Sequence, residues 1–381
     1  MEGRPNILHI VPSYKPAWIY GGPIMSVSEL CQWESHTGQE VSVYTTTANG
    51  KEELPVQTGV PIDVEGVSVF YFNRWTKDHT HFSPALFLKL WKNAKNFDCI
   101  HIHSWWNLLT LFSVFVLFLQ RKKYILSPRG MLSPYTLGHS GLKRKFLKFP
   151  GKFLLKNAVF HATSPQEASE LKALFPQNQI TCLPNFVKIP DPVFSHNPKS
   201  EPDILNLLFL SRIDPKKGLE RSFLILSELT REWTLTLAGT GNPNYILSLK
   251  EYAVTLGIEN KLSWKGHVGG KDKFQLYADH DFLILLSENE NFANVVAESV
   301  AMGTPVLISP QVGLSDWITE TQTGWVLKDK NKLVDLLSTL QSINQISENT
   351  RKNGYRLVKE AFYSVNLAKK YVNFYQSLVK Q

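Results

Sequence analysis

Short apolar runs, each followed by a longer stretch of mixed polarity, recur along the whole chain. In the first half they lie at residues 6–11, 41–45, 68–72, 99–103, 124–126 and 159–162. Continuous apolar runs of this length are typical of strands that are buried on both faces of a parallel sheet. Because helical patterns such as residues 24–36 stand between several of them, the first half is predicted to be a doubly wound α/β domain.

The second half repeats the pattern, with apolar runs at residues 205–210, 233–238, 262–264, 282–286 and 305–309. Between the halves, residues 186–203 contain four prolines, which prevent regular structure and indicate a linker. An amphipathic helical pattern at residues 363–378 closes the chain. We therefore expect two Rossmann-like domains, at 1–188 and 200–360, followed by a terminal helix within 361–381.

Two acids stand out in the segment 287–309, which is otherwise mostly apolar. Glu290 is expected in the loop after the strand 282–286, at the edge of the sheet where open α/β folds bind ligands. Unpaired N–H groups of the following helix, which is predicted to end at Gly303, would lie beside it. Glu298 falls inside that helix among valines and alanines, so it needs hydrogen-bond donors, and sugar or ribose hydroxyls are such donors.

The spacing of these acids closely resembles the Glu-x7-Glu motif of the retaining GT-B glycosyltransferases of family 4. This chain has Glu290-Asn-Phe-Ala293 where that family usually has Glu-Gly-Phe-Gly. The resemblance implies two Rossmann-like domains that face an interdomain cleft, with the acceptor on the 1–188 domain and the nucleotide-sugar on the 200–360 domain. It also implies that Glu290 contacts the donor sugar and that Glu298 holds the ribose. A helix-capping role would explain Glu290 alone.

A basic loop follows the strand 205–210, at the position where a phosphate-binding loop is expected. Arg212, Lys217 and Gly218 match the Arg-x4-Lys-Gly of the resembled family, which implies that the two cations hold the donor diphosphate. An ordinary basic turn on the surface is the alternative. The other predicted donor-binding residues lie at glycine turns, strand ends and the helix start, and they are Gly21, Gly22, Val268, Phe292, Ala293, Asn294, Gly313 and Leu314.

Two histidines alternate onto one face of the predicted strand 99–103. We interpret His101 as a core residue, whereas His103, at the strand end, matches the histidine that approaches donor sugar and acceptor in the resembled family. His103 is therefore predicted to be catalytic, together with Glu290, Arg212 and Lys217. Arg129 lies in a Pro-Arg-Gly-Met segment that a subset of these enzymes shares, and it is predicted to face an anionic acceptor group.

The composition changes this picture little. With 43% hydrophobic and 19% charged residues, the chain is typical of a globular protein and not of a disordered one. Its three cysteines are widely spaced and suggest neither a disulfide framework nor a zinc site, which fits the cytoplasm. The start of the sequence lacks the basic and then apolar pattern of a secretory signal, and the apolar run 108–119 is too short to span a bilayer.

The net charge of +8 indicates affinity for anions. Residues 121–156 contain ten Lys or Arg and no acid, and the stretch 142–156 interleaves these cations with residues such as Leu142 and Phe153. Such a face suits an anionic membrane surface. A solvated basic helix that packs on the core would explain the same pattern equally well.

Together these features predict a retaining glycosyltransferase that needs no metal and no cofactor. It would move a sugar from a UDP- or GDP-sugar to a glycan or lipid-linked acceptor, in the cytoplasm or at the inner face of the cell membrane, in surface polysaccharide synthesis. Nucleic acid is not expected as a partner. Two alternatives stay open, because fold alone does not fix chemistry: a sugar-nucleotide epimerase or phosphorylase on the same fold, and a non-catalytic scaffold that binds membrane or nucleic acid.

Overall fold

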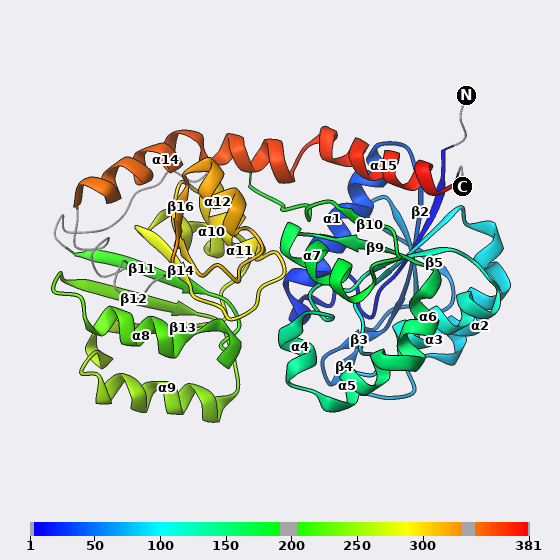
Figure 1. The fold of residues 1–381 in the computed structure, drawn as a ribbon, viewed down its shortest axis with the longest axis horizontal. Coiled ribbons are helices and arrows are strands. Elements are labelled where there is room, and N and C mark those ends of the chain that lie inside the picture. Colours follow the sequence, from blue (N-terminus) through cyan, green and yellow to red (C-terminus); the bar gives the residue numbers. More distant parts are fainter. Residues whose placement is uncertain (1–3, 191–203, 329–339, 380–381) are drawn as a thin grey trace. The chain divides into compact units, whose positions relative to one another are not determined.

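The computed structural model describes residues 4–190, 204–328 and 340–379, which fold into two units (Figure 1). Unit 1 comprises Met1–Phe186 and Ser364–Gln381, and unit 2 comprises Val187–Tyr363. Each unit is built on one mainly parallel sheet whose strands are connected largely through helices. The α/β class with two Rossmann-like domains, which the sequence predicts, is therefore confirmed.

The sheet of unit 1 has eight strands in the order β10-β9-β8-β7-β1-β2-β6-β5. Their bounds are β1 Asn6–Ile10, β2 Glu40–Thr46, β5 Pro61–Val64, β6 Val67–Phe72, β7 Cys99–His103, β8 Tyr124–Ser127, β9 Ala158–Ala162 and β10 Ile180–Cys182. A short hairpin joins β3 Ala48–Asn49 to β4 Glu52–Glu53. The chain builds outward from β1 through β2 and β6 and then returns to add β7 on the other side. The carboxyl ends of β1 and β7 thus border a topological switch point, where open α/β sheets bind ligands.

The helices of unit 1 include the last helix of the chain. They are α1 Gly22–His36, α2 Pro84–Asn93, α3 Leu108–Leu119, α4 Pro134–Gly138, α5 Gly141–Phe146, α6 Lys152–Leu154, α7 Pro165–Leu174 and α15 Val365–Val379. Figure 1 shows α15 in red beside α1 in blue. Leu367, Tyr371 and Tyr375 of α15 are buried, together with Ile7 and Cys99 of the sheet. The terminal helix therefore completes the core of unit 1.

Unit 2 is a six-stranded parallel sheet in the order β13-β12-β11-β14-β15-β16. Its strands are β11 Leu205–Leu210, β12 Trp233–Ala238, β13 Leu262–Gly266, β14 Phe282–Leu285, β15 Val306–Ile308 and β16 Gly324–Val326. Its described helices are α8 Leu219–Ser227, α9 Pro243–Thr255, α10 Gly270–Ala278, α11 Asn294–Ala301, α12 Ser315–Thr321 and α14 Leu340–Phe362. Here the strand order reverses between β11 and β14, so the loops that follow these two strands meet at the switch point.

Every strand that the sequence predicts is present within two residues of its predicted bounds. The strands that the sequence misses, β3, β4, β5, β10 and β16, are short and lie in the hairpin or at the edges of sheets. On β5 exposed residues alternate with half-buried ones, because this edge strand covers only part of the core. Edge strands of this kind carry no continuous apolar run that could identify them.

Helix α3, which forms from the apolar run that is too short to span a bilayer, is buried on one face only. Leu109, Val114 and Leu117 are fully buried, whereas Phe112, Phe115 and Leu119 are exposed on the other face. Over the described ranges, no helix combines the length and the apolar character that a membrane crossing requires. All three cysteines are free thiols. Residues 191–203 of the predicted linker lie outside the described residues.

Candidate active site

Three loops of unit 2 pack tightly at the carboxyl edge of its sheet, and glycine allows this packing. A Cβ on Gly218 would lie 2.1 Å from the carbonyl oxygen of Leu286, in the loop after β14. One on Gly239 would lie 1.8 Å from the carbonyl oxygen of Ser211, in the loop after β11. Gly218 also has a φ of +70°, which glycine adopts at little cost. The glycine beside Lys217 thus serves to bring the basic loop against the loop that carries Glu290.

Lys217 and Glu290 form an ion pair at this edge. The Lys217 side chain is almost completely buried, and Glu290 is held from both sides by backbone bonds. The Glu290 N–H donates to the carbonyl oxygen of Gln311 at 3.0 Å, and the Gly313 N–H donates to the carbonyl oxygen of Glu290 at 2.8 Å. Arg212 lies exposed in the same basic loop. The structure therefore brings the basic loop into contact with an acid that stands 73 positions from Lys217 in the sequence.

Glu298, on α11, is buried, and each of its carboxylate oxygens accepts one hydrogen bond. Lys273 donates to its Oε1 at 2.8 Å, and the Tyr277 hydroxyl donates to its Oε2 at 2.9 Å. Burial and the adjacent Glu298 carboxylate raise the pKa of Tyr277 well above its ordinary value. The sequence predicts that Glu298 needs donors, and α10 supplies two of them. Lys273 and Tyr277 are four residues apart on one helix, which is a signal that sequence reasoning missed.

The start of α11 keeps a glycine-like backbone without a glycine. Ala293 precedes the helix with φ +69° and ψ +74°, in the left-handed region. Phe292 turns its side chain into the core of unit 2, where its ring lies 5.3 Å from that of Phe362. Only the backbone of Phe292 is left for a ligand. Asn294, the first helical residue, is half-buried.

The remaining predicted donor-binding residues differ in what they offer. Gly313 is buried, and its N–H already donates a hydrogen bond to the carbonyl oxygen of Glu290. This N–H group is therefore not available to a ligand. Leu314 is buried, whereas Val268 is half-buried and packs against the core of unit 2. In unit 1, Gly21 and Gly22 are exposed at the start of α1, and Gly21 has a φ of +63°.

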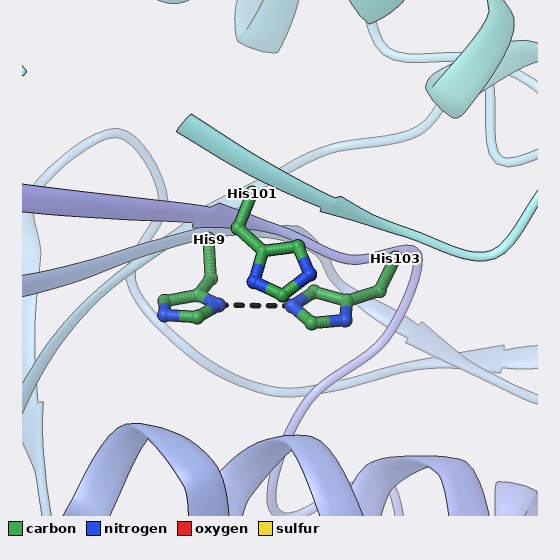
Figure 2. A group of neighbouring side chains, drawn as sticks. All are labelled: His9, His101 and His103. Atoms are coloured by element: carbon green, nitrogen blue, oxygen red, sulfur yellow. Dashed lines mark hydrogen bonds between the residues drawn. The ribbon is translucent and has the colours of Figure 1, made fainter. Parts of the chain in front are cut away.

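In unit 1, His103 is sealed inside the protein at the end of β7. Figure 2 shows its contact with His9 of β1, in which His103 Nε2 and His9 Nδ1 are 2.9 Å apart. On its other side, His103 Nδ1 lies 3.2 Å from Nη2 of Arg129. Arg129 also donates to Asn185 Oδ1 at 3.0 Å and to Ser26 Oγ at 3.1 Å. Of the pair that the sequence predicts on the acceptor side, only the partly exposed Arg129 reaches the surface.

His101 is a core residue, as its position on the strand predicts. It is fully buried, and its two ring nitrogens bond to Tyr375 and Ser127 at 3.0 and 2.6 Å. Burial, with neighbouring histidines and Arg129, holds the pKa values of His101 and His103 well below their ordinary range. Burial also lowers the pKa of His9, but Cys31 and the Glu34 carboxylate outweigh it and raise that pKa.

Within the described residues, two buried groups gather three side chains that could ligate a metal: His9, His101 and His103, and His9, Cys31 and Glu34. The rings of His101 and His103 stack at 4.1 Å and 30°, so their in-plane lone pairs run side by side and do not converge on one point. His9 Nε2 and Glu34 Oε2 lie 2.7 Å apart, whereas two ligands of one tetrahedral zinc ion stand roughly 3.3 Å apart. The geometry of both groups fits hydrogen bonds better than a metal ion.

The basic stretch 142–156 divides between core and solvent. Leu147 is buried, and Lys143 lies 5.5 Å over the ring of Trp106. By contrast, Leu142 is 82% exposed and Phe153 is 60% exposed. The structure describes no side chain for residues 144, 148 and 149. Packing on the core therefore accounts for part of the stretch and leaves two large apolar side chains in solvent.

Asp279, His280 and Asp281 precede β14, and their contacts hold the helix–strand junction in place. Asp281 Oδ2 accepts from the Asn206 N–H of the neighbouring strand at 2.8 Å. His280 bonds to the Leu276 carbonyl oxygen and to Thr236 Oγ1, at 2.6 and 2.9 Å. These contacts give Asp281 and His280 a structural role.

Two family models match consecutive parts of the chain. The model described as "Glycosyl transferase 4-like domain" matches residues 21–185, and that described as "Glycosyl transferases group 1" matches residues 193–357. Together they account for most of the sequence.

Among individual proteins, an uncharacterized glycosyltransferase of Methanocaldococcus jannaschii is 27% identical over 172 residues, which cover 45% of this chain and 44% of the relative. An uncharacterized 41.2 kDa protein in the cps region of Klebsiella pneumoniae is 22% identical over 77% of this chain and 83% of its own length. Alpha-monoglucosyldiacylglycerol synthase of Streptococcus pneumoniae is 26% identical over 44% of this chain and 38% of its own length. The match to the first of these thus spans less than half of that protein.

Solved structures show the same fold at low identity. Sucrose-phosphate synthase from Thermosynechococcus elongatus superposes with a TM-score of 0.76 at 18% identity, over 98% of this chain and 99% of the other. HepE of Anabaena, solved in complex with UDP and glucose, gives a TM-score of 0.70 at 17% identity, over 98% of this chain and 100% of HepE. With the family models on both halves, these likenesses place the chain: it belongs to the group 1 glycosyltransferases and has the GT-B fold.

Proposed function

We propose that this chain is a retaining, metal-independent transferase that moves a sugar from a UDP- or GDP-sugar onto a glycan or lipid-linked acceptor. The observation that carries the proposal is the Lys217–Glu290 ion pair at the switch point of unit 2, beside the start of α11. A diphosphate needs cations and backbone donors, and a sugar needs a carboxylate that accepts from its hydroxyls. The pair, with Arg212, offers both in one place.

In the absence of donor, Lys217 is neutralised by Glu290. An arriving diphosphate offers Lys217 and Arg212 stronger anionic partners, and Glu290 is then released to accept hydrogen bonds from the sugar. Binding of the diphosphate and positioning of the sugar are thereby coupled. Lys217 exchanges Glu290 for the diphosphate, and Glu290 exchanges Lys217 for the sugar hydroxyls. The cations would stabilise the charge that develops on the departing diphosphate, a role that metal ions fill in other enzymes.

Glu298 can hold the ribose without giving up its protein partners. An ionised carboxylate has about four lone-pair sites, and Lys273 and Tyr277 use two of them. The other sites are left for ribose hydroxyls. The two donors on α10 would fix the direction of the carboxylate before the nucleotide arrives, which is the preorganisation that binding sites require.

The chemical step would be a front-face substitution. The bond between the anomeric carbon and the diphosphate oxygen breaks, and its electron pair leaves with the nucleoside diphosphate. The acceptor oxygen bonds to the same face of the sugar, and its proton passes to the departing diphosphate oxygen. The configuration at the anomeric carbon is retained. Positioning and electrostatics would supply most of the rate enhancement.

We further propose that the acceptor is anchored to an anionic membrane on the cytoplasmic side, as in surface polysaccharide assembly. The supporting observation is the pair of exposed apolar side chains, Leu142 and Phe153, next to the exposed cations Lys145 and Lys152. Apolar side chains that insert, with lysines that meet headgroup phosphates, are the two requirements of interfacial binding. The Streptococcus relative, whose name specifies a diacylglycerol product, supports a lipid-linked acceptor.

Thermal unfolding with UDP, GDP, ADP and NAD in turn tests the donor proposal. A ligand at a hundred times its dissociation constant stabilises by about 2.7 kcal/mol, which raises the midpoint by several degrees. We expect a rise with UDP or GDP only. A cooperative transition that no nucleotide shifts would contradict the proposal and favour the scaffold. Incubation with a UDP- or GDP-sugar and acceptor then separates a transferase, which releases the nucleotide, from an epimerase, which does not.

Vesicle flotation tests the membrane proposal separately. Vesicles with phosphatidylglycerol should carry the protein upward, and vesicles of phosphatidylcholine alone should not. Exchange of Leu142 and Phe153 for serine should abolish flotation, while the same exchange at Leu247 and Val254, two exposed residues of α9, should leave it intact. Equal flotation of all three proteins would refute the assignment of this surface.

A further inference from the structure

A chain of four side chains runs through the interior of unit 1. It begins at Glu34 of α1, passes through His9 of β1 and His103 of β7, and ends at Arg129 in the loop after β8. Glu34 Oε2 and His9 Nε2 are 2.7 Å apart, His9 Nδ1 and His103 Nε2 are 2.9 Å apart, and His103 Nδ1 and Arg129 Nη2 are 3.2 Å apart. Glu34 and His9 are fully buried and His103 nearly so. A buried carboxylate and a guanidinium are thus connected through two imidazoles.

The direction of every hydrogen bond in this chain follows from Arg129. A guanidinium has donors and no acceptor, so Nδ1 of His103 must accept from it and carries no proton. The single proton of neutral His103 therefore sits on Nε2 and is donated to His9 Nδ1. His9 then carries its own proton on Nε2 and donates it to Glu34. Although Cys31 and Glu34 raise the pKa of His9, a second proton on His9 Nδ1 would face the proton on His103 Nε2 at 2.9 Å. All three contacts are therefore satisfied only with both imidazoles neutral, so that each donor meets one acceptor.

We propose that Glu34 and His9 are positioning residues that hold His103 in its Nε2–H tautomer, so that His103 Nδ1 fixes the guanidinium of Arg129 for the reaction. This inference rests on the transferase function proposed above. His103 then acts through Arg129, because its ring is sealed from solvent and both of its nitrogens are engaged. The proposal assigns roles to two residues that no motif identifies.

Two features of the site favour a functional chain over a structural one. Burial of a carboxylate is costly, and apolar residues of similar volume would often stabilise the fold as well or better. In addition, Arg129 has a φ of +53°, in the left-handed region that a long side chain rarely adopts, and its buried Nε has no hydrogen-bond partner within the described residues. Backbone strain and an unpaired buried donor are typical of residues held for a ligand.

Two substitutions of His9 separate its two contacts. The amide of glutamine can replace Nε2 of the ring, so His9→Gln keeps a donor for Glu34 and removes the acceptor for His103. The shorter asparagine replaces Nδ1, so His9→Asn keeps the acceptor for His103 and loses the donor for Glu34. We expect His9→Gln to lower kcat by roughly 10- to 100-fold, the range seen when a functional histidine loses its outer partner. His9→Asn should lower it less, because it keeps the acceptor for His103 and loses only the contact with Glu34 that orients residue 9.

The tautomer itself is read by nuclear magnetic resonance on the full chain labelled with ¹⁵N-histidine, with the His103 signals assigned from a His103→Gln spectrum. His103 should carry its proton on Nε2 in the wild type and in His9→Asn, and a population protonated on Nδ1 should appear in His9→Gln. UDP affinity should stay unchanged in both His9 variants, because the nucleotide is bound by residues of unit 2.

His161→Gln is the matched control. His161 of β9 is also fully buried, and it bonds to Ser127 Oγ at 2.6 Å and to the Leu183 carbonyl oxygen at 3.0 Å. This variant should lose thermal stability and keep both the His103 tautomer and kcat. An Nδ1–H tautomer in the wild type, or equal kcat in the two His9 variants, would overturn the proposal. A wild type without transferase activity would instead refute the proposed function. The tautomer of His103 would still show whether the hydrogen bonds from Glu34 to Arg129 run in the proposed direction.

Discussion

Two groups of buried charges, one in each unit, are arranged in opposite ways. In unit 2, Glu290 and Glu298 each meet a lysine directly, on loops and helix ends at the edge of the sheet. In unit 1, Glu34 and Arg129 never touch, and two neutral imidazoles inside the sheet connect them. Direct ion pairs can exchange their partners for a ligand, whereas a chain sealed in the core can only orient what lies at its end. The first arrangement suits binding and the second suits positioning.

Acidification should separate the units most strongly. The pKa of His81 is lowered to about 4 and that of His161 to about 3, chiefly by burial, and those of His101 and His103 are lowered as well. Below about pH 6.5 these histidines are protonated in the unfolded chain but not in the folded protein. The free energy of unfolding therefore falls by about 1.4 kcal/mol for each histidine and for each unit by which the pH decreases. In unit 2, burial lowers the pKa of His280.

Hydrogen exchange measured on peptides of each unit at pH 7 and pH 5 checks this. Unit 1 should lose protection by several kcal/mol, and unit 2 should lose much less. His161→Gln should reduce the pH dependence of unit 1 by the share of one histidine. Equal loss of protection in both units would contradict the account of sealed neutral histidines.

Glu290→Gln should cost the most activity. The substitution keeps the shape and removes the charge that pairs with Lys217 and accepts from the sugar, so kcat should fall by about 100- to 1,000-fold. Steady-state kinetics with the donor identified by thermal unfolding measures it. Glu288→Gln, two residues earlier at an exposed position, should leave kcat unchanged. Comparable losses in both variants would argue against a specific role for Glu290.

The partners of Glu298 make a smaller and purely energetic test. Tyr277→Phe removes a buried hydroxyl that donates to a carboxylate, a contact worth about 2 kcal/mol of unfolding free energy. Tyr245→Phe removes a hydroxyl that donates to Glu220 at 2.8 Å near the surface, and it should cost less than half as much. Urea unfolding compares the two. An equal cost would mean that burial adds nothing to the Glu298 contact.

Ala293→Gly should stabilise unit 2 slightly. A left-handed conformation costs a residue with a Cβ about 1–2 kcal/mol, while glycine loses part of that gain through the greater freedom of its unfolded chain. We expect a net gain of about 0.5–1 kcal/mol in urea unfolding. The same substitution at Ala297, inside α11, should instead destabilise by about 1 kcal/mol. Destabilisation at both sites would show that Ala293 is not strained.

The comparison of the units also explains what the sequence could predict. The site of unit 2 can be predicted from short segments of sequence. Arg212 and Lys217 follow one apolar strand, Glu290 follows another, and parallel strands bring such loops to one edge of the sheet. The series of hydrogen bonds from Glu34 to Arg129 in unit 1 cannot be predicted in this way. His9 and His103 meet only because β1 pairs with β7, and the register that sets His9 opposite His101 cannot be read from either strand alone. One signal was available: His9 is the one polar residue among the buried residues of β1.

Side-chain direction was the other limit of the sequence. The strand end at His103 and the loop that carries Gly313 after β15 were located correctly. Yet His103 is buried in the core and the Gly313 N–H bonds to Glu290. Spacing gives the position of a residue along an element. It does not reveal which neighbours, contributed by distant segments, already use its hydrogen bonds. The same holds for Glu298, whose partners Lys273 and Tyr277 lie on another helix.

The central claim is that the Lys217–Glu290 pair marks the donor diphosphate site, and calorimetric titration of UDP and GDP into three proteins tests it most directly. The wild type and Lys216→Met should bind one of the two nucleotides with similar affinity, because among the ion pairs of the described residues Glu290 is joined to Lys217 and not to Lys216. Lys217→Met should bind it at least tenfold more weakly, which corresponds to about 1.4 kcal/mol. Equal affinity in all three proteins, or no binding to the folded wild type, would contradict the account.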